Sequence, residues 1–372
     1  MKRIWRRMAS PTNNPGNLQY DSFAVNHGAT GYVIGEGGVQ IAVFPDEATG
    51  YAALYAYIGP ESNAAPSSFQ NVKDLRFIFT LGTQDASFVD GQKMNTLTLQ
   101  GLRASVNIDN AGGAYLGTLT AQIFGMNASH MNTLTSPQWD QNFFTSTGST
   151  FGFNKIQVFA IDGAQETLVY NGEILNSWGV YTSMPDVYLY LQAQIGYAAL
   201  VQPTGPLSIA ANTDVATAMQ QIATAMGYSF ENNGVSAIVT KGTYKANTLM
   251  EQARSLMRDY RFWMSIDPTS PNTLVITPYA TARNIAAPLI SPQTGLIGYP
   301  LFNETGVNFE TLFSPGITLL GPVNLQSSLP KANGTWLVTS CSHQLSSQTL
   351  GGPWKTTVNA VWPATTQAQG GQ

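Results

Sequence analysis

Few residues in this sequence are of types that do acid–base or nucleophilic chemistry. The 372 residues include one cysteine, Cys341, and three histidines, His27, His130 and His343. Cys341 and His343 lie two positions apart in a segment that we expect to form a β-strand. Their side chains would then point to the same face, about 7 Å apart. Such a pair could act as a nucleophile and its base, but we favour a small buried thiol beside a hydrogen-bonded imidazole.

Signatures of metal and cofactor sites are absent from the sequence. No two histidines have the H-x-x-x-H or H-E-x-x-H spacing of zinc sites, and a single cysteine excludes multi-cysteine metal sites and intramolecular disulfides. The glycine-rich segment 28–38 contains no G-x-x-x-x-G-K-[ST] motif. Residues 107–109 resemble part of a calcium loop but lack its terminal glutamate. We therefore predict no catalytic residue, no cofactor and no metal.

Three carboxylates, Asp162, Glu166 and Glu173, lie close together in the sequence. Hydrolysis of a glycosidic bond needs two carboxyl groups that face each other. Asp162, however, precedes Gly163, and an Asp-Gly pair between alternating apolar segments is typical of a hairpin turn. We favour a solvated turn over a lytic site.

The main concentration of charge lies at the N-terminus, in the segment MKRIWRRMAS. Such a cluster is consistent with a terminus that is exposed to solvent, and also with an arm that binds an acidic neighbouring protein. A tryptophan among the charges favours the arm. The predicted partner-contact residues are Lys2, Arg3, Trp5, Arg6 and Arg7.

The composition is poor in charge. Charged residues make up 10% of the chain, against about 25% in an average globular protein, and the net charge is −4. Apolar residues make up 43%, which is enough for sizeable cores and excludes disorder as the main state. The polar surface must therefore consist of uncharged side chains, which suits burial against protein partners. Without a basic excess, we do not expect tight binding to duplex DNA.

The sequence also bears on the cellular compartment. No apolar segment follows the basic N-terminus, and the longest apolar run, 51–58, is too short to span a bilayer. A single cysteine is typical of a protein made in reducing cytoplasm. We therefore expect neither a secretory signal nor a membrane span.

Composition and patterning divide the chain into an N-terminal extension with a linker (1–71), a first block (72–202), a central block (203–280), a C-terminal block (281–365) and a tail (366–372). The first and C-terminal blocks show short alternating runs that predict strands. Hairpins are predicted at Asp90-Gly91, Gly112-Gly113, Asp162-Gly163, Asn171-Gly172 and Asn333-Gly334.

The central block has helical patterning. Its first helix should begin after Thr213 or Asp214 and end at Gly227. Its second should begin at Thr248, where Glu251 completes a capping box. Segments 261–266 and 273–277 predict two strands joined by a turn at 267–272. The apolar stripes are Val215, Met219, Ile222 and Met226 on the first helix, and Leu249, Ala253, Leu256, Met257 and Tyr260 on the second.

Several long segments resemble one known family. The sequence GLRASVNIDNAGGAYLGTLTAQIFGMNASHMNTLT at 101–135 resembles the first domain of the baseplate hub proteins of long-tailed bacteriophages. The segments 154–163 and 170–203 resemble the same domain, while 289–329 and 334–358 are similar to the last domain of the hub. The central block resembles the small α/β domain that lies between them. The resemblance covers residues 70 to 365, and 1–70 has no counterpart in it.

The resemblance implies an α+β, mainly β fold: two tail-tube-like β-barrel domains flank a small α/β domain, with an N-terminal extension. It implies a non-enzymatic structural protein of the phage tail baseplate, synthesised in the host cytoplasm. Three copies with two barrels each would match a six-fold tail tube, seat a three-fold central spike and leave a channel for DNA. The implied partners are two further copies, the tail tube protein, the spike and a tape-measure protein. Separately from the resemblance, we expect the N-terminal extension (1–71) to reach outward and bind another baseplate protein.

Three alternatives stay open at this point. The chain could be a hexameric tail-tube or distal tail protein, or a tail enzyme that cleaves peptidoglycan. It could also be a protein that binds a host receptor or a sugar, which exposed tryptophan and tyrosine side chains on strands would favour.

Overall fold

The computed structural model describes residues 72–82, 87–89, 93–112, 115–135, 152–182 and 184–363, together with the backbone of four short strands nearer the N-terminus. The predicted linker (60–71) and tail (366–372) lie outside the described residues. The chain divides into two compact units, Met1–Ser67 and Ser68–Gln372. Strands outnumber helices, so the prediction of a mainly β fold is confirmed.

The first unit contains a four-stranded antiparallel sheet in the order β1-β2-β3-β4. Its strands are β1 (Lys2–Ile4), β2 (Phe23–Val25), β3 (Tyr32–Glu36) and β4 (Val39–Phe44).

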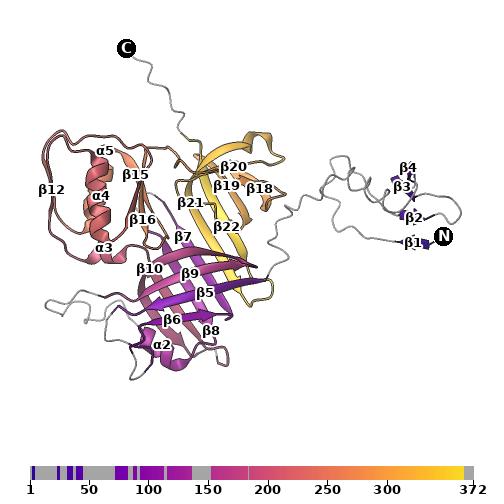
Figure 1. The fold of residues 1–372 in the computed structure, drawn as a ribbon, viewed down its shortest axis with the longest axis horizontal. Coiled ribbons are helices and arrows are strands. Elements are labelled where there is room, and N and C mark those ends of the chain that lie inside the picture. The colour runs from indigo at the N-terminus through magenta and orange to yellow at the C-terminus, as the bar shows by residue number, and fades with distance from the viewer. Residues whose placement is uncertain are drawn as a thin grey trace, which may run out of the picture. The chain divides into compact units, whose positions relative to one another are not determined.

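The second unit is built on one 13-stranded sheet that runs through both the first and the C-terminal block (Figure 1). Its main path is β18-β19-β22-β21-β7-β8-β11-β10-β9-β5-β6, and β17 and β20 pair beside β21. The first block contributes β5 (Lys73–Thr80), β6 (Thr96–Gln100), β7 (Ala104–Asn110), β8 (Thr118–Phe124), β9 (Lys155–Asp162), β10 (Gln165–Val180) and β11 (Tyr188–Gln194). The C-terminal block contributes β17 (Leu289–Ile290), β18 (Leu296–Phe302), β19 (Gly306–Leu312), β20 (Pro322–Leu325), β21 (Gly334–Ser347) and β22 (Trp354–Val361).

The two blocks meet where β21 pairs with β7. The pairing is antiparallel and runs from Cys341 opposite Asn110 to Ser347 opposite Ala104. Backbone hydrogen bonds therefore cross the boundary between the blocks in the same way as they cross the inside of either one.

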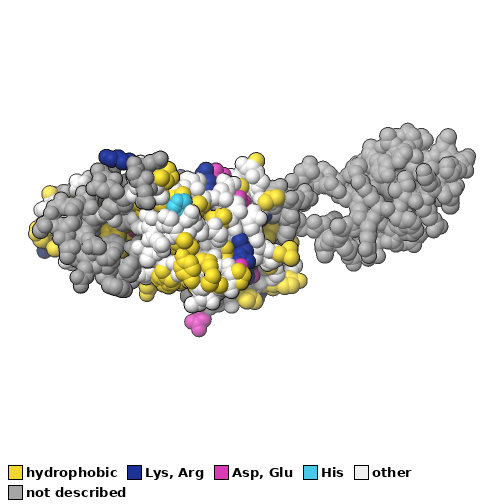
Figure 2. Space-filling model, turned by 90° about the horizontal axis from the view of Figure 1, so that it is seen from below, with side chains coloured by type: hydrophobic (Ala, Val, Ile, Leu, Met, Phe, Trp, Pro, Cys, Tyr) yellow, Lys and Arg dark blue, Asp and Glu magenta, His cyan; other side chains and the backbone are white. Residues whose placement is uncertain are grey.

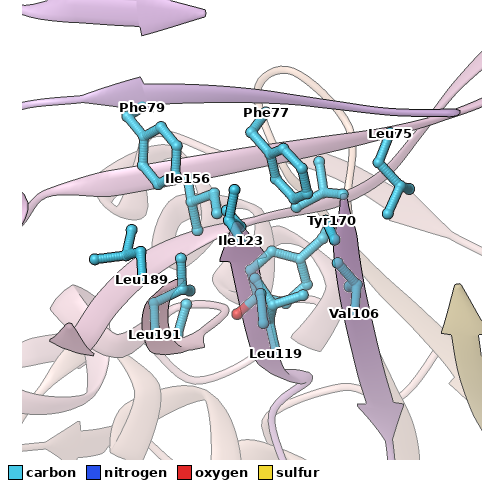
Figure 3. Close-up of a cluster of buried hydrophobic side chains, with 14 of the residues drawn as sticks. Leu75, Phe77, Phe79, Val106, Leu119, Ile123, Ile156, Tyr170, Leu189 and Leu191 are labelled. Atoms are coloured by element: carbon cyan, nitrogen blue, oxygen red, sulfur yellow. The ribbon is translucent and has the colours of Figure 1, made fainter. Parts of the chain in front are cut away.

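The first core shows why the first block forms strands. In β5, Leu75, Phe77 and Phe79 alternate with half-buried residues, so one face of the strand is fully buried. These side chains meet large apolar residues from β7 to β11, among them Val106, Leu119, Ile123, Ile156, Tyr170, Leu189 and Leu191 (Figure 3). The same core includes Leu345 of β21 and Trp354 of β22, so it takes in both blocks.

The central block holds two helices, α4 (Val215–Met226) and α5 (Leu249–Tyr260), and both begin where the sequence predicts. The side chain of Asp214 accepts a hydrogen bond from the N–H of Ala216, and that of Thr248 accepts one from the N–H of Glu251. Gly227 ends α4 with a φ of 76°. The helices cover a sheet in the order β13-β16-β15, with a β12-β14 pair beside it. These strands are β12 (Leu207–Ile209), β13 (Ser229–Asn232), β14 (Thr243–Lys245), β15 (Phe262–Asp267) and β16 (Thr273–Pro278).

The buried face of α5 is rotated from the predicted stripe. Met250 and Gln252 are buried together with the predicted Ala253 and Leu256, whereas Leu249, Met257 and Tyr260 are only partly buried. Gln252 is tolerated inside because its side-chain amide donates to the carbonyls of Gly205 and Asn247.

Strand β21 serves two cores. Trp336 and Val338 pack in the core of the C-terminal block, together with Cys341, and Leu345 packs in the first core. A bulge lies between Val338 and Ser340, where the pairing with β22 shifts register. Because a bulge inserts one extra residue, alternation resumes with the opposite parity, and both sets of apolar side chains face inward.

Two of the predicted hairpin turns are confirmed and one is wrong. Asp162-Gly163 joins β9 to β10, and the segment around Gly112 joins β7 to β8. Asn171-Gly172, by contrast, lies inside the 16-residue β10. Glycine is needed here because there is no room for a side chain. A Cβ at Gly172 would lie 2.7 Å from the Tyr170 hydroxyl and 3.0 Å from the backbone of Gln194.

Other expectations need smaller corrections. Asn333-Gly334 closes a longer connection between β20 and β21, in which the Asn333 side chain accepts a hydrogen bond from the N–H of Ser327. Asp90-Gly91 lies outside the described residues. The structure also contains short helices that the strand-like reading of these segments missed, α2 (Ala128–Leu134), α3 (Tyr197–Val201) and the 3-10 helix η4 (Pro330–Ala332).

Candidate functional site

The three blocks meet around a cavity of about 170 Å³. Its lining comes from all of them: Asn110 from the first block, Asp267 from the central block, and Phe313, Cys341 and His343 from the C-terminal block. Cys341 and His343 lie on the same face of β21, as predicted, and both are buried. This junction therefore brings together the one cysteine of the sequence, His343 and Asp267.

The chemistry of this pair does not suit nucleophilic catalysis. Burial raises the pKa of the Cys341 thiol to about 12, and burial lowers the pKa of His343 to about 4. The Asn110 side chain donates to the Cys341 sulfur at 3.8 Å, and Nδ1 of His343 lies 2.8 Å from the hydroxyl of Thr356. Near neutral pH the thiol keeps its proton and the imidazole is uncharged, so the interpretation of a buried thiol beside a hydrogen-bonded imidazole is confirmed.

The buried His343 predicts a pH dependence of stability. Because its folded pKa of about 4 lies below the usual value of 6.5, the unfolded chain binds this proton first as the pH falls. Its contribution is fully present above about pH 6.5, and about 3 kcal/mol is lost between about pH 6.5 and 4. Urea denaturation at pH 7 and pH 4.5 should show a smaller drop for His343→Gln than for the unsubstituted chain. Equal drops would contradict the prediction.

The three carboxylates of the sequence analysis do not converge. Asp162 pairs with Lys73 and Glu166 pairs with Arg76. Glu166 is opposite Ile161 in the pairing of β9 with β10, so Asp162 and Glu166 point to opposite faces of the sheet. Glu173 lies seven residues beyond Glu166 on the same strand, which places them roughly 23 Å apart. Facing glycosidase carboxyls lie within about 10 Å of each other. Glu173 is too far from Glu166 to meet this requirement, and Asp162 and Glu166 lie on opposite faces.

Glu173 is nevertheless unusual because it is buried, with 4% of its surface exposed. Its carboxylate accepts a hydrogen bond of 3.0 Å from the N–H of Tyr197, where α3 begins. Burial raises the pKa of Glu173, and Lys155 and the backbone N–H groups oppose this only in part. The hydrogen bond joins β10 to α3, but the ionised carboxylate that accepts it is buried away from water, which is unfavourable.

Replacing Glu173 with glutamine should therefore stabilise the protein at pH 7. The amide oxygen of Glu173→Gln can still accept from Tyr197, while the buried charge is removed. We expect a gain on the order of 1 kcal/mol at pH 7, measured by urea denaturation. The gain should vanish below about pH 4.5, where the carboxyl is protonated in both states. Glu173→Ala, which removes the acceptor, should destabilise at both pH values, and the same response from both variants would contradict this account.

The central block is fixed to the C-terminal block by Arg283. Its guanidinium donates to both carboxylate oxygens of Glu231, at 3.1 and 2.7 Å, and forms an ion pair with Asp267. Its backbone N–H donates to the carbonyl of Leu320 at 2.9 Å. Burial tends to raise the pKa of Glu231, but hydrogen bonds from Arg283 and Asn233 bring it below its usual value. Burial raises the pKa of Asp267 in spite of the arginine.

The central block is fixed to the first block by Asn171. Its side chain donates to the carbonyl of Thr269 at 2.7 Å, and its own carbonyl accepts from the side chain of Asn272 at 3.0 Å. Sequence reasoning missed both Asn171 and Arg283 as junction residues. The carboxylate partners of Arg283 lie 52 and 16 positions away in the sequence, and no local pattern points to contacts at such separations.

The predicted partner-contact residues are not tested by these contacts. Lys2 and Arg3 belong to β1, of which only the backbone is described, and Trp5, Arg6 and Arg7 lie outside the described residues. Within the described ranges, no three side chains of His, Cys, Asp or Glu gather as metal ligands. In the same ranges, no helix combines the length and the apolar character that crossing a lipid bilayer requires.

Comparison with known proteins places the fold. Residues 79–357 match the family model described as baseplate hub gp41. No curated protein matches the sequence.

Two solved structures have the same fold at low sequence identity. A tail protein from Neisseria meningitidis is 8% identical with a TM-score of 0.50, and the match covers 77% of this chain and 96% of that one. A type VI secretion component from E. coli, described as structurally similar to bacteriophage T4 tail proteins gp27 and gp5, is 9% identical with a TM-score of 0.50. That match covers 71% of this chain and 74% of the other. A 43 kDa tail protein of a Shewanella oneidensis prophage is 11% identical, with a TM-score of 0.49 and coverages of 77% and 97%.

The family match extends over most of the chain, reaches into all three blocks and includes the pairing of β21 with β7 that joins the first block to the C-terminal block. The chain therefore belongs to the baseplate hub gp41 family of phage tail structural proteins.

Proposed function

We propose that this protein forms the trimeric hub ring of a phage tail baseplate. The ring adapts a six-fold tail tube on one face to a three-fold central spike on the other, and it leaves a channel for DNA. The observation that carries the proposal is the family match across residues 79–357, which spans both strand-rich blocks.

The proposed domain division follows the three blocks. Residues 72–202 and 281–365 each form a tail-tube-like barrel, 203–280 form the α/β domain between them, and 1–71 form an extension. Curling of the first block is supported by a contact between strands that are distant along the sheet: six strands separate β5 from β22, yet the Lys73 ammonium lies 5.9 Å from the centre of the Trp354 ring. A curled, continuously hydrogen-bonded sheet resists bending, which suits a wall that carries load.

A match between three-fold and six-fold symmetry accounts for the two strand-rich blocks in one chain. Three copies with two barrels each give six wall segments, which match the subunits of a six-fold tube. Contacts around such a ring are heterologous, so each copy needs two different patches. The low charge of the described surface supports extensive burial: in Figure 2 hydrophobic and uncharged side chains predominate, with isolated charged ones between them.

The proposed role is structural. Among the described residues, burial keeps the Cys341 thiol protonated and the His343 imidazole uncharged near neutral pH, and Asp162 and Glu166 form ion pairs with Lys73 and Arg76. The partners that we propose are the tail tube protein, the spike, a tape-measure protein and, through residues 1–71, other baseplate proteins. Lys2, Arg3, Trp5, Arg6 and Arg7 are the proposed contacts of that extension.

The mass of the purified assembly tests the proposal. The chain has a mass of 40.0 kDa, so three copies give about 120 kDa and six give about 240 kDa. Native mass spectrometry should find the trimer, whereas a hexamer would favour a tail-tube or distal tail protein. Clearing of cell-wall substrate that disappears on Glu173→Gln or Cys341→Ser would instead favour the peptidoglycan-cleaving enzyme.

A truncated chain that lacks residues 1–70 should still form the ring and lose only its attachment to other baseplate proteins. Recovery of monomers alone from this truncation would show that the extension builds the ring.

A further inference from the structure

The edge strand β18 exposes an unusual amount of apolar surface. Ile297, Tyr299, Leu301 and Phe302, here called the β18 patch, are 39, 72, 66 and 51% exposed. The strand sequence, LIGYPLF, contains no charged residue. Exposed contiguous apolar surface of this kind usually marks a contact with another molecule.

The backbone of β18 is unsuited to open-ended strand addition. Its pairing with β19 shifts register between Ile297 and Leu301, Gly298 has a φ of 67°, and Pro300 has no N–H to donate. Bulges and prolines are devices that keep an edge strand from pairing with unrelated chains. The β18 patch is therefore available to a partner through its side chains.

A second, different patch lies on the outer face of β8, β10 and β11. Trp178 is directly opposite Tyr190, with ring centres 4.8 Å apart, and Tyr188 is opposite Phe124, with ring centres 5.0 Å apart. These four rings, here called the aromatic patch, are half-buried or exposed, and Trp178 is 43% exposed.

The charges beside the aromatic patch are already paired. The Arg103 guanidinium stacks 3.9 Å from the centre of the Phe124 ring and forms an ion pair of 2.9 Å with Asp186. Aromatic rings and arginine are enriched among the residues that contribute most of the binding energy in protein interfaces, and unpaired charges are depleted there. The aromatic patch has this composition.

The two patches suit each other and lie apart on the chain. Both present apolar surface without net charge, so neither would desolvate an unpaired charge by packing on the other. Five strands of the sheet separate β18 from β11. A closed ring requires two unlike patches at separate places on each subunit, and these two meet that requirement.

We infer that in the ring the β18 patch of one copy packs on the aromatic patch of the next. This inference rests on the proposed ring and names the surfaces that close it. Each copy then donates one patch and accepts the other, so the C-terminal block of one copy contacts the first block of its neighbour.

Charged substitutions test both patches. The double variant Tyr299→Glu/Leu301→Glu and the single variant Trp178→Glu should each shift the assembly from trimer to monomer at concentrations where the unsubstituted chain is trimeric. Tyr244→Glu is the matched control, because Tyr244 is 66% exposed on β14 of the central block and outside both patches. A trimer that persists in either patch variant would overturn the inference. If the unsubstituted chain itself is monomeric, the proposed ring fails instead.

Cross-linking tests whether the two patches meet. Leu301→Cys and Trp178→Cys chains, mixed and treated with a short bifunctional maleimide, should give a linked pair of chains. Neither variant alone should do so. The native Cys341 is buried, and burial raises its pKa to about 12, so it does not compete for the reagent. Linked pairs from one variant alone would indicate a two-fold contact. An absence of linked pairs in the mixture would show that the two patches do not meet. Either result overturns the inference.

Discussion

Replacing Arg283 with alanine is expected to lower the free energy of unfolding by about 3–5 kcal/mol at pH 7. The side chain is almost fully buried, and its removal leaves the carboxylates of Glu231 and Asp267 close together without a cation. Breaking a buried ion pair on one side is costly because the remaining charge stays desolvated. Urea denaturation of the full chain measures the loss.

The pH dependence distinguishes this mechanism from a simple loss of packing. The pKa of Glu231 lies below its usual value, so its contribution to stability is present above about pH 4.5 and is lost as the pH falls further. The effect of Arg283→Ala should therefore shrink in acid. Arg258→Ala, at an exposed position of α5, should change stability by less than about 0.5 kcal/mol. A loss below about 1 kcal/mol for Arg283→Ala would contradict the account.

Replacing Phe77 with alanine should cost about 3–5 kcal/mol and weaken both strand-rich blocks together. Phe77 is fully buried in the first core, which also contains Leu345 and Trp354 of the C-terminal block. Because β21 pairs with β7 along seven residues, neither block can open its side of the junction without exposing the other. Hydrogen exchange, followed peptide by peptide, should show faster exchange in β19 and β22 as well as in β5.

The control for this prediction is Phe77→Leu, which leaves most of the apolar volume and should cost less than about 1.5 kcal/mol. Exchange that accelerates only in the first block would show that the two blocks unfold independently, and would contradict the reading of the sheet as one cooperative unit.

The parts of the fold that could be predicted are those with local causes. The limits of α4 and α5 follow from Asp214, Gly227 and Thr248, which act on neighbouring backbone groups. Strands such as β5 and β9 follow from alternation over eight residues. The Cys341–His343 pair was placed on one face because strand periodicity decides it.

The parts that could not be predicted depend on distant partners. Asn171-Gly172 has the composition of a turn, yet β10 continues through it because β9 pairs with both residues and β11 pairs with β10 from Glu173 onward. Tertiary pairing here overrides a local preference. The shared sheet, the Arg283 ion pairs and the buried Glu173 all join residues from different parts of the chain, and no local pattern encodes such pairing.

Because β21 contributes side chains to two hydrophobic cores, its length can vary little between related proteins. Deleting one residue between Val338 and Leu345 would turn one set of inward side chains toward solvent while leaving the other in place. Compensation would require a matching change in the bulge at Thr339 or in both partner strands. Insertions and deletions should therefore accumulate in the connections, such as the one between β20 and β21, while β21 keeps a constant residue count across its relatives.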